Sequence, residues 1–224
     1  MSDSHQVVGP SEPIVWGHFE TIEQQEEANV FGMWLFLAQE IMFFGGLFAA
    51  YAVYRFKYPD AWHEGSLQLN IWWGALNTSV LLASSLTMAM CIWAAQRSKL
   101  KLQIQLLVTT LLLGCVFLFI KWYFEWPAKF NHGLIPGPWW NPDVADFTVD
   151  LGNLQLFFVM YFIMTGMHAL HMVIGVCIGI WLLINSINKT YGENRYLPLE
   201  FFGFYWHFVD VVWVFLFPLF YLVS

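Results

Sequence analysis

The chain has 224 residues, of which 58% are hydrophobic and only 11% are charged, and its net charge is −7. So few charged residues cannot cover a water-soluble globule of this size, so the composition indicates an integral membrane protein and excludes a soluble enzyme. The negative charge also disfavours nucleic-acid binding.

Residues 1–28 form an acidic tail without Lys or Arg. A secretory signal or a mitochondrial transit peptide needs positive charge, so this segment fits neither class. We expect the tail to lie in the cytoplasm and residues 29–224 to form a single membrane domain, because only short loops separate the apolar runs that follow.

Five apolar runs are long enough to cross the membrane as helices, which takes about 20 residues each. They cover residues 31–54, 71–95, 103–126, 154–187 and 201–223. Backbone groups in lipid must bond within the protein, so the expected fold class is all-α, an integral membrane bundle with five transmembrane helices. The fourth run exceeds one crossing, which predicts tilt or projection beyond the membrane.

Basic residues near the span ends predict the orientation. With a cytoplasmic N-terminus, five of them lie inside and three outside; the inner ones are Arg97, Lys99, Lys101, Lys189 and Arg195, and the outer ones are Arg55, Lys57 and Lys129. This orientation puts the C-terminus on the outer side. We expect a multi-pass protein of a bacterial plasma (inner) membrane, in which that side is the periplasm.

The first span contains an acid near its middle, Glu40, in the stretch LFLAQEIMFFGG. A carboxylate at that depth costs about 3 kcal/mol on insertion scales. No basic residue lies within one helical turn, and the same stripe of the helix is apolar, so Glu40 is a candidate proton donor or acceptor. The alternative is an acid that hydrogen-bonds a neighbouring helix.

Polar residues recur at helical spacing in the later spans. A weak seam in the second span contains Gly74, Asn77, Thr78, Ser84 and Ser85. In the third span, Lys121 and Glu125 are four residues apart, which predicts a charge pair that lowers the cost of both charges.

The fourth and fifth spans each place polar and small residues on one stripe. The fourth has His168, His171, Gly175 and Gly179, and the fifth has Glu200, Gly203, His207 and Asp210. We expect the two stripes to face each other and to form a polar network that holds the helices in register. A proton relay and a metal site are the alternatives, whereas the few histidines within the spans do not suffice for several haem centres. The three cysteines lack metal-ligand spacing and are expected to pack as small hydrophobes.

From Asn29 onwards the sequence resembles subunit III of the haem-copper terminal oxidases, most closely the cytochrome c oxidase type, in its short five-span form. The resemblance rests on FGMWLFLAQEIMFFGGLF, YFEWPAKF, YFIMTGMHALHMVIG and EFFGFYWHFVDVVWVFLF. It implies that Glu40 is the family's carbodiimide-reactive intramembrane acid, and that His168, His171, Glu200, His207 and Asp210 are its other motif residues.

The resemblance also implies a function. The chain would be a non-catalytic subunit of a proton-pumping oxidase, with no haem, copper or other cofactor of its own and no catalytic residue. It would stabilise catalytic subunit I, bind phospholipid and support sustained proton uptake. Where the seven-span form has a lipid-binding Arg, this chain has Asn185, so Lys189 or Arg195 is the candidate for the lipid head group.

Four other functions are compatible with parts of the pattern. Two of them belong to the family, namely a subunit III of a quinol oxidase and one of a nitric-oxide-reductase complex. A third is a membrane cytochrome, which would show haem absorbance in the purified chain alone. From a different class comes an independent ion-coupled transporter, but the sequence has neither an inverted repeat nor a pair of broken helices.

Overall fold

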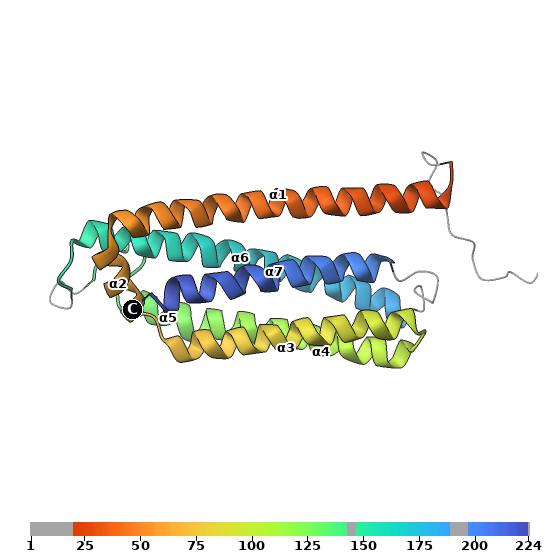
Figure 1. Ribbon diagram of the computed structural model, residues 1–224. Helices are drawn as coiled ribbons and strands as arrows, with labels where there is room; N and C mark the ends of the chain where they lie inside the picture. Colours follow the sequence, from red (N-terminus) through yellow and green to blue (C-terminus); the bar gives the residue numbers. More distant parts are fainter. Residues whose placement is uncertain (1–19, 143–146, 189–196, 224) are drawn as a thin grey trace, which may run out of the picture. The chain divides into compact units, whose positions relative to one another are not determined.

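The computed structural model describes residues 20–142, 147–188 and 197–223 (Figure 1). Among these, five helical segments are long and apolar enough to cross a membrane, which confirms the predicted all-α class. Four of them correspond to α1 (Ile22–Lys57), α3 (Ile71–Gln96), α6 (Leu151–Ile187) and α7 (Leu197–Tyr221), and the third in chain order, Leu100–Asn131, begins with α4 (Leu100–Ile120).

The chain divides into two compact units, Met1–Met42 and Phe43–Ser224. The described part of the first unit is the beginning of α1. This helix starts at Ile22, well before the predicted span, so the end of the acidic tail is already helical. The second unit contains the rest of α1 and all the other described helices.

Polar caps mark where two spans of the second unit begin. The Asn70 side chain accepts a hydrogen bond from the backbone N–H of Trp72 at 3.0 Å, and the Asp150 side chain accepts one from Asn153 at 3.2 Å. Such caps satisfy N–H groups that have no partner within the helix. They place the starts of α3 and α6 close to the predicted span boundaries.

A short helix, α2 (Pro59–Leu67), was not predicted by the sequence. Pro59 suits a first helical turn because that turn does not need its N–H. The indole of Trp62 is fully buried and makes edge-to-face contacts with Tyr51 and Phe157. Burial of this aromatic side chain attaches α2 to the end of the bundle.

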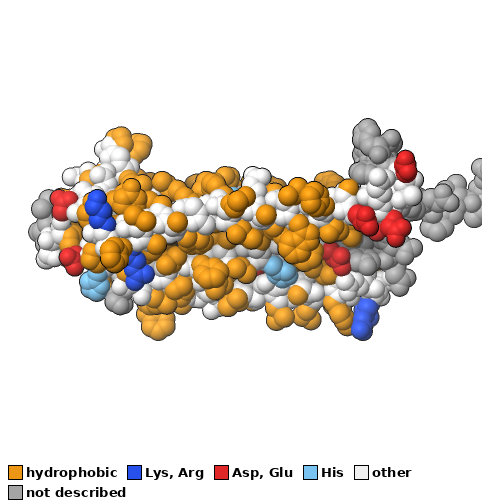
Figure 2. All heavy atoms as spheres, turned by 45° about the horizontal axis from the view of Figure 1, so that its top comes forward, with side chains coloured by type: hydrophobic (Ala, Val, Ile, Leu, Met, Phe, Trp, Pro, Cys, Tyr) orange, Lys and Arg blue, Asp and Glu red, His pale blue; other side chains and the backbone are white. Residues whose placement is uncertain are grey.

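Within the second unit, four spans pack as a ring: α7 packs against α3 and α6, and α4 packs against the same two helices (Figure 1). The Tyr51 hydroxyl in the C-terminal part of α1 donates a hydrogen bond to the Leu219 carbonyl of α7. Figure 2 shows apolar side chains along the visible helices and charged side chains toward the helix ends, as expected for membrane spans.

Glycines allow the helices to approach Trp206 of α7 closely. A Cβ on Gly114 of α4 would lie 2.7 Å from the buried Trp206 ring, and one on Gly175 of α6 would lie 3.1 Å from it. The glycines therefore open the space for an indole that is also fixed by a hydrogen bond to Ser84 at 3.1 Å. This is the close small-residue packing expected in membranes.

We predict that Gly114→Ala destabilises the protein by about 1–3 kcal/mol, because the new methyl group displaces a rigid, buried ring. Gly166→Ala in α6 is the matched control, since a Cβ there meets nothing within 4 Å. Thermal unfolding of the detergent-purified variants measures the difference. Equal melting temperatures for the two variants would contradict this packing.

Candidate functional site

A buried ion pair lies at the end of the third span. Lys121 and Glu125 delimit η1 (Lys121–Glu125), a single π-helical turn between α4 and the short helix α5 (Trp126–Asn131). Their side chains are 3% and 5% exposed, and the Lys121 ammonium bonds directly to a Glu125 carboxylate oxygen. π-Helical turns of this kind are rare and often occur at functional sites.

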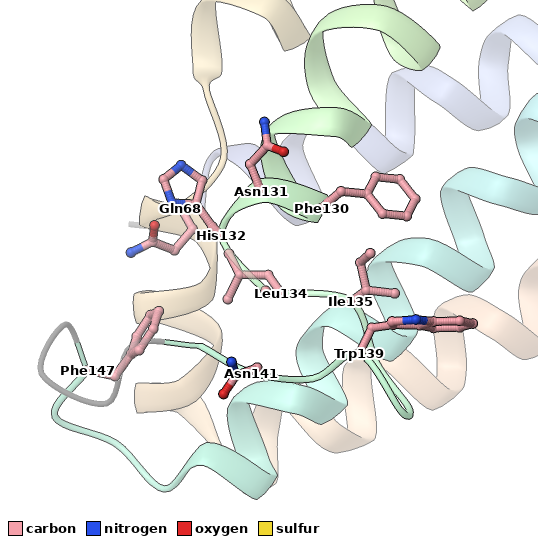
Figure 3. A pocket seen from close by; sticks show the side chains of 10 residues that line it. Gln68, Phe130, Asn131, His132, Leu134, Ile135, Trp139, Asn141 and Phe147 are labelled. Atoms are coloured by element: carbon pink, nitrogen blue, oxygen red, sulfur yellow. The ribbon is translucent and has the colours of Figure 1, made fainter.

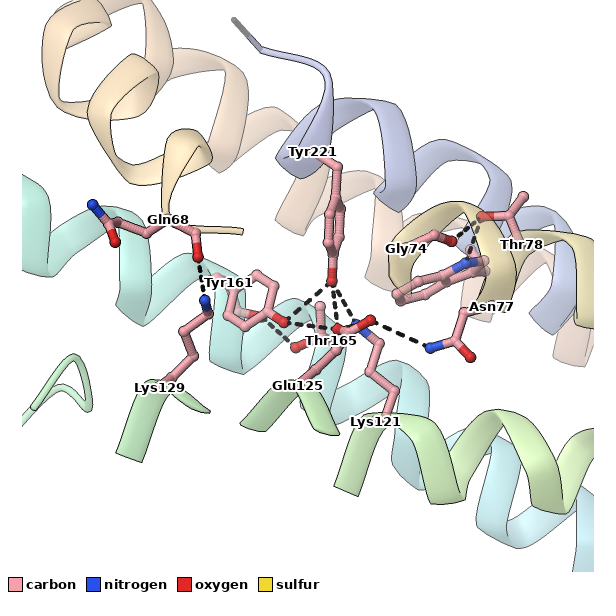
Figure 4. Close-up of polar contacts among 11 residues, drawn as sticks. Gln68, Gly74, Asn77, Thr78, Lys121, Glu125, Lys129, Tyr161, Thr165 and Tyr221 are labelled. Carbon is pink, nitrogen blue, oxygen red and sulfur yellow. Dashed lines mark hydrogen bonds and ion pairs between the residues drawn. The ribbon is translucent and has the colours of Figure 1, made fainter. Parts of the chain in front are cut away.

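Four more hydrogen bonds connect this pair to three other spans (Figure 4). Tyr221 of α7 donates to Glu125 at 2.6 Å and accepts from Lys121 at 2.8 Å. Tyr161 of α6 donates to Glu125 at 3.3 Å, and Asn77 of α3 donates to it at 3.4 Å. The Glu125 carboxylate is thus the common acceptor at the meeting point of α3, η1, α6 and α7.

A second buried lysine lies near the pair. Lys129 of α5 donates a hydrogen bond to the Gln68 carbonyl just after α2, and it is 7% exposed. A cavity of about 100 Å³ is lined by residues that include Glu125, Lys129 and Tyr161. Burying a charge away from water is costly unless it has hydrogen-bond and ionic partners of good geometry. The stability of this cluster therefore depends on the groups that surround it.

A separate polar seam runs between α3 and α7. Ser85 and the Nδ1 atom of His207 are 2.6 Å apart, and the Trp213 indole donates to Thr78 at 3.1 Å. The Asp210 carboxyl is buried beside Ser84 and Ser85, but neither of its oxygens has a hydrogen-bond partner of good geometry among the described residues. The α7 polar stripe therefore faces the serine and threonine seam of α3.

The two histidines of α6 are bonded elsewhere. The Nε2 atom of His168 lies 3.1 Å from the Val209 carbonyl of α7, and the ring is fully buried between Phe117 and Trp213. His171 is half-buried, with its Nδ1 atom 2.8 Å from the Met167 carbonyl one turn earlier.

These contacts correct the expectation that the stripes of the fourth and fifth spans face each other. His168 does reach α7, but its partner there is a backbone carbonyl, while His207 and Asp210 point to α3. The physical reason is that α7 packs between α3 and α6, so only one of its faces can meet α6.

Four predicted site residues remain, namely Glu200, Glu40, Lys189 and Arg195. Glu200, at the beginning of α7, accepts a hydrogen bond from Gln96 of α3 at 2.8 Å. Glu40 lies on α1 within the first unit. Lys189 and Arg195 fall outside the described residues. Among the described residues, no group of three or more His, Cys, Asp or Glu side chains could hold a metal ion.

A pocket of about 850 Å³ opens beside the loop that follows α5 (Figure 3). Among the described residues, its lining combines amide side chains with aromatic rings and contains no Lys, Arg, Asp or Glu. Gly133 forms part of its wall with a φ of 65°, and a Cβ there would lie 2.3 Å from the Asn141 carbonyl oxygen. Glycine is therefore required at this turn.

Sequence reasoning missed several members of the Glu125 cluster. The sequence did not identify Tyr161 and Tyr221, which belong to other helices and bond to Glu125. It also did not place Lys129 near the pair. One signal was present: a Lys–Glu pair inside a span needs further hydrogen-bond partners, and tyrosines near the ends of neighbouring spans can supply them.

Comparisons with known proteins agree on one family. Residues 143–224 match the family model described as cytochrome c oxidase subunit III. A cytochrome c oxidase subunit 3 of Corynebacterium diphtheriae is 30% identical, over 86% of this chain and 87% of its own length. A probable cytochrome c oxidase subunit 3 of Mycobacterium bovis is 28% identical, over 96% of this chain and 98% of its own length.

The chain is also similar to part of a larger archaeal protein. It is 30% identical to a heme-copper oxidase subunit I+III of Aeropyrum pernix over 85% of this chain. The match covers 22% of that protein, so the chain spans about a fifth of its length.

We predict that Glu125→Gln destabilises the protein by about 3–5 kcal/mol, because the buried Lys121 ammonium loses its counter-charge while the side-chain shape is kept. The double variant Lys121→Met/Glu125→Gln should recover part of that loss, since it removes the uncompensated charge. Thermal unfolding in detergent measures both. A single variant as stable as the parent would show that the pair does not stabilise the fold.

Proposed function

Because the chain belongs to the cytochrome c oxidase subunit III family and is a subunit III of a haem-copper oxidase, we propose that it acts as the non-catalytic scaffold of that complex. In this role it stabilises the catalytic subunit and supports sustained proton uptake while oxygen is reduced to water. The subunits of the complex are its partners.

The observation that supports the scaffold role is that the buried polar groups bond to other helices of the same chain. In the second unit, Glu125 and Lys121 bond to one another and to three spans, and Ser85 meets His207 across the α3–α7 contact. Groups committed to helix contacts hold a bundle together, whereas a catalytic or transport site needs groups that face a substrate. This arrangement supports a structural role within the complex.

We assign the chemistry of the complex to its other subunits. In this proposal, electron transfer and oxygen reduction take place at haem and copper held by the partner chains, and this chain contributes no redox centre. Bound phospholipid completes the assembly. The complex lies in a bacterial plasma membrane with the N-terminus of this chain in the cytoplasm, as the distribution of Lys and Arg indicates.

Glu40 is the residue to which we assign the support of proton uptake. It lies near the middle of the 36-residue helix α1, within an apolar stretch of sequence. An ionisable group at that depth is costly and is generally functional. Glu40 would help to supply protons to the partner subunit over many turnovers without belonging to the obligatory pathway.

The relatives do not favour the alternatives. The matching family model and the bacterial relatives are named for cytochrome c oxidase, which favours neither a quinol oxidase nor a nitric-oxide-reductase complex. They also do not favour an independent transporter.

We predict that Glu40→Gln leaves assembly and initial oxygen consumption nearly intact, because the amide keeps the shape and most of the hydrogen bonding of the acid. Over prolonged turnover, however, the activity of the variant should decline faster than that of the parent. Continuous oxygen-electrode recording on the reconstituted oxidase, with proton release followed in parallel, measures both phases.

Glu27→Gln is the matched control, since it removes an exposed acid from the first turns of the same helix. It should change neither phase. Loss of the first turnovers in Glu40→Gln would mean that the acid is obligatory, and an unchanged long assay would mean that its role is structural only.

A further inference from the structure

The turn between α3 and α4 contains a group of three cations. Its sequence, RSKLK, places Arg97, Lys99 and Lys101 within five residues, and all three side chains are exposed. Within residues 20–142, 147–188 and 197–223, no carboxylate forms an ion pair with Arg97, Lys99 or Lys101. The acid Glu200 on α7 lies nearby, but its bond is to the Gln96 amide.

Two of these cations share one aromatic ring. The Arg97 guanidinium lies 4.5 Å from the centroid of the Trp93 ring, and the Lys99 ammonium lies 4.9 Å from it. Trp93 itself is 40% exposed. A cation on an indole face keeps most of its N–H groups available, so both cations can still donate hydrogen bonds outward.

Backbone hydrogen bonds define the turn from which the two cationic side chains extend. Lys99 N–H bonds to the Ala94 carbonyl and Ser98 N–H bonds to the Ala95 carbonyl, both at 3.0 Å. This is the Schellman closure of a helix, in which the residue with positive φ is usually glycine. Here that residue is Ser98, with a φ of 54°. The turn thus keeps two like charges together at a rigid site, at some cost in strain and repulsion.

The position of the turn indicates which anion meets it. α3 and α4 are both long and apolar enough to span a membrane, so the loop that joins them lies where the hydrocarbon ends and the lipid phosphates begin. Trp rings prefer this interface, and Arg and Lys extend their charged ends from it into the head-group layer. Clusters of basic residues at this depth attract anionic lipids.

We propose that Arg97 and Lys99, held against Trp93, bind the phosphate of one anionic phospholipid, with Lys101 contributing charge from the first turn of α4. The planar guanidinium bonds two phosphate oxygens at once, and the ammonium bonds a third. The indole packs beside the glycerol of the same lipid. The proposal involves residues other than Lys189 and Arg195, and it depends on neither the role of Glu40 nor that of the oxidase partners.

The test is a lipid titration on the purified oxidase. Dioleoyl phosphatidylglycerol is added to the complex in a neutral detergent, and bound lipid is counted by native mass spectrometry. Arg97→Gln/Lys99→Gln should lose one high-affinity lipid, with its affinity lowered roughly thirtyfold. Lys99→Gln alone should show a smaller loss in the same lipid, which provides a milder variant if the double one is poorly stable.

Two variants serve as controls. Lys57→Gln removes a cation that also lies against an aromatic ring, 5.1 Å from the Tyr58 centroid, near a different span end. It should retain the lipid, and an equal loss there would refute a specific site. Ser98→Gly relieves the strained φ and keeps all three cations, so it should bind as the parent does.

A further arm separates the lipid from its phosphate group. Inorganic phosphate at millimolar concentration should neither displace the bound lipid nor raise the melting temperature of the delipidated complex. Full competition by inorganic phosphate would overturn the assignment to a lipid. Unchanged lipid binding in Arg97→Gln/Lys99→Gln would overturn the site as a whole.

Discussion

The ion pair between Lys121 and Glu125 is the interaction on which the second unit depends. Lipid offers no hydrogen bonds, so a charge in a span must find every partner within the protein. Glu125 meets this requirement by accepting bonds from helices that are distant in sequence, through Asn77, Tyr161 and Tyr221. The positions of α3, α6 and α7 around η1 follow from that requirement.

The same constraint explains the rest of the arrangement. Because α7 lies between α3 and α6, its polar stripe can face only one of these two helices. It faces α3, where His207 contacts the hydroxyl group of Ser85. His168 of α6 then bonds to a backbone carbonyl of α7 instead of a side chain. Trp206 fills the space left by glycines on α4 and α6, and its indole also bonds to Ser84 of α3, so close packing and hydrogen bonding meet at this residue.

The sequence predicts the spans well because the length and hydropathy of an apolar run can be read directly from consecutive residues. The spacing of Lys121 and Glu125 predicts their pair, since residues four apart on a helix are neighbours. The partners of the pair could not be predicted, because a hydrogen bond between helices depends on how each helix is rotated. The contact of His168 with the Val209 carbonyl could not be predicted either, because every residue has a backbone carbonyl. The π-helical turn and α2 depend on tertiary packing.

The most direct test of a scaffold role is the distribution of haem and metal among the separated subunits. The oxidase is purified through a tag on this chain, its subunits are then dissociated, and the iron, copper and visible absorbance of each are measured. The account predicts that haem-bearing subunits co-purify and that this chain, once separated, is colourless and without stoichiometric metal. Stoichiometric haem, iron or copper in the isolated chain, or purification without any haem-bearing partner, would contradict it.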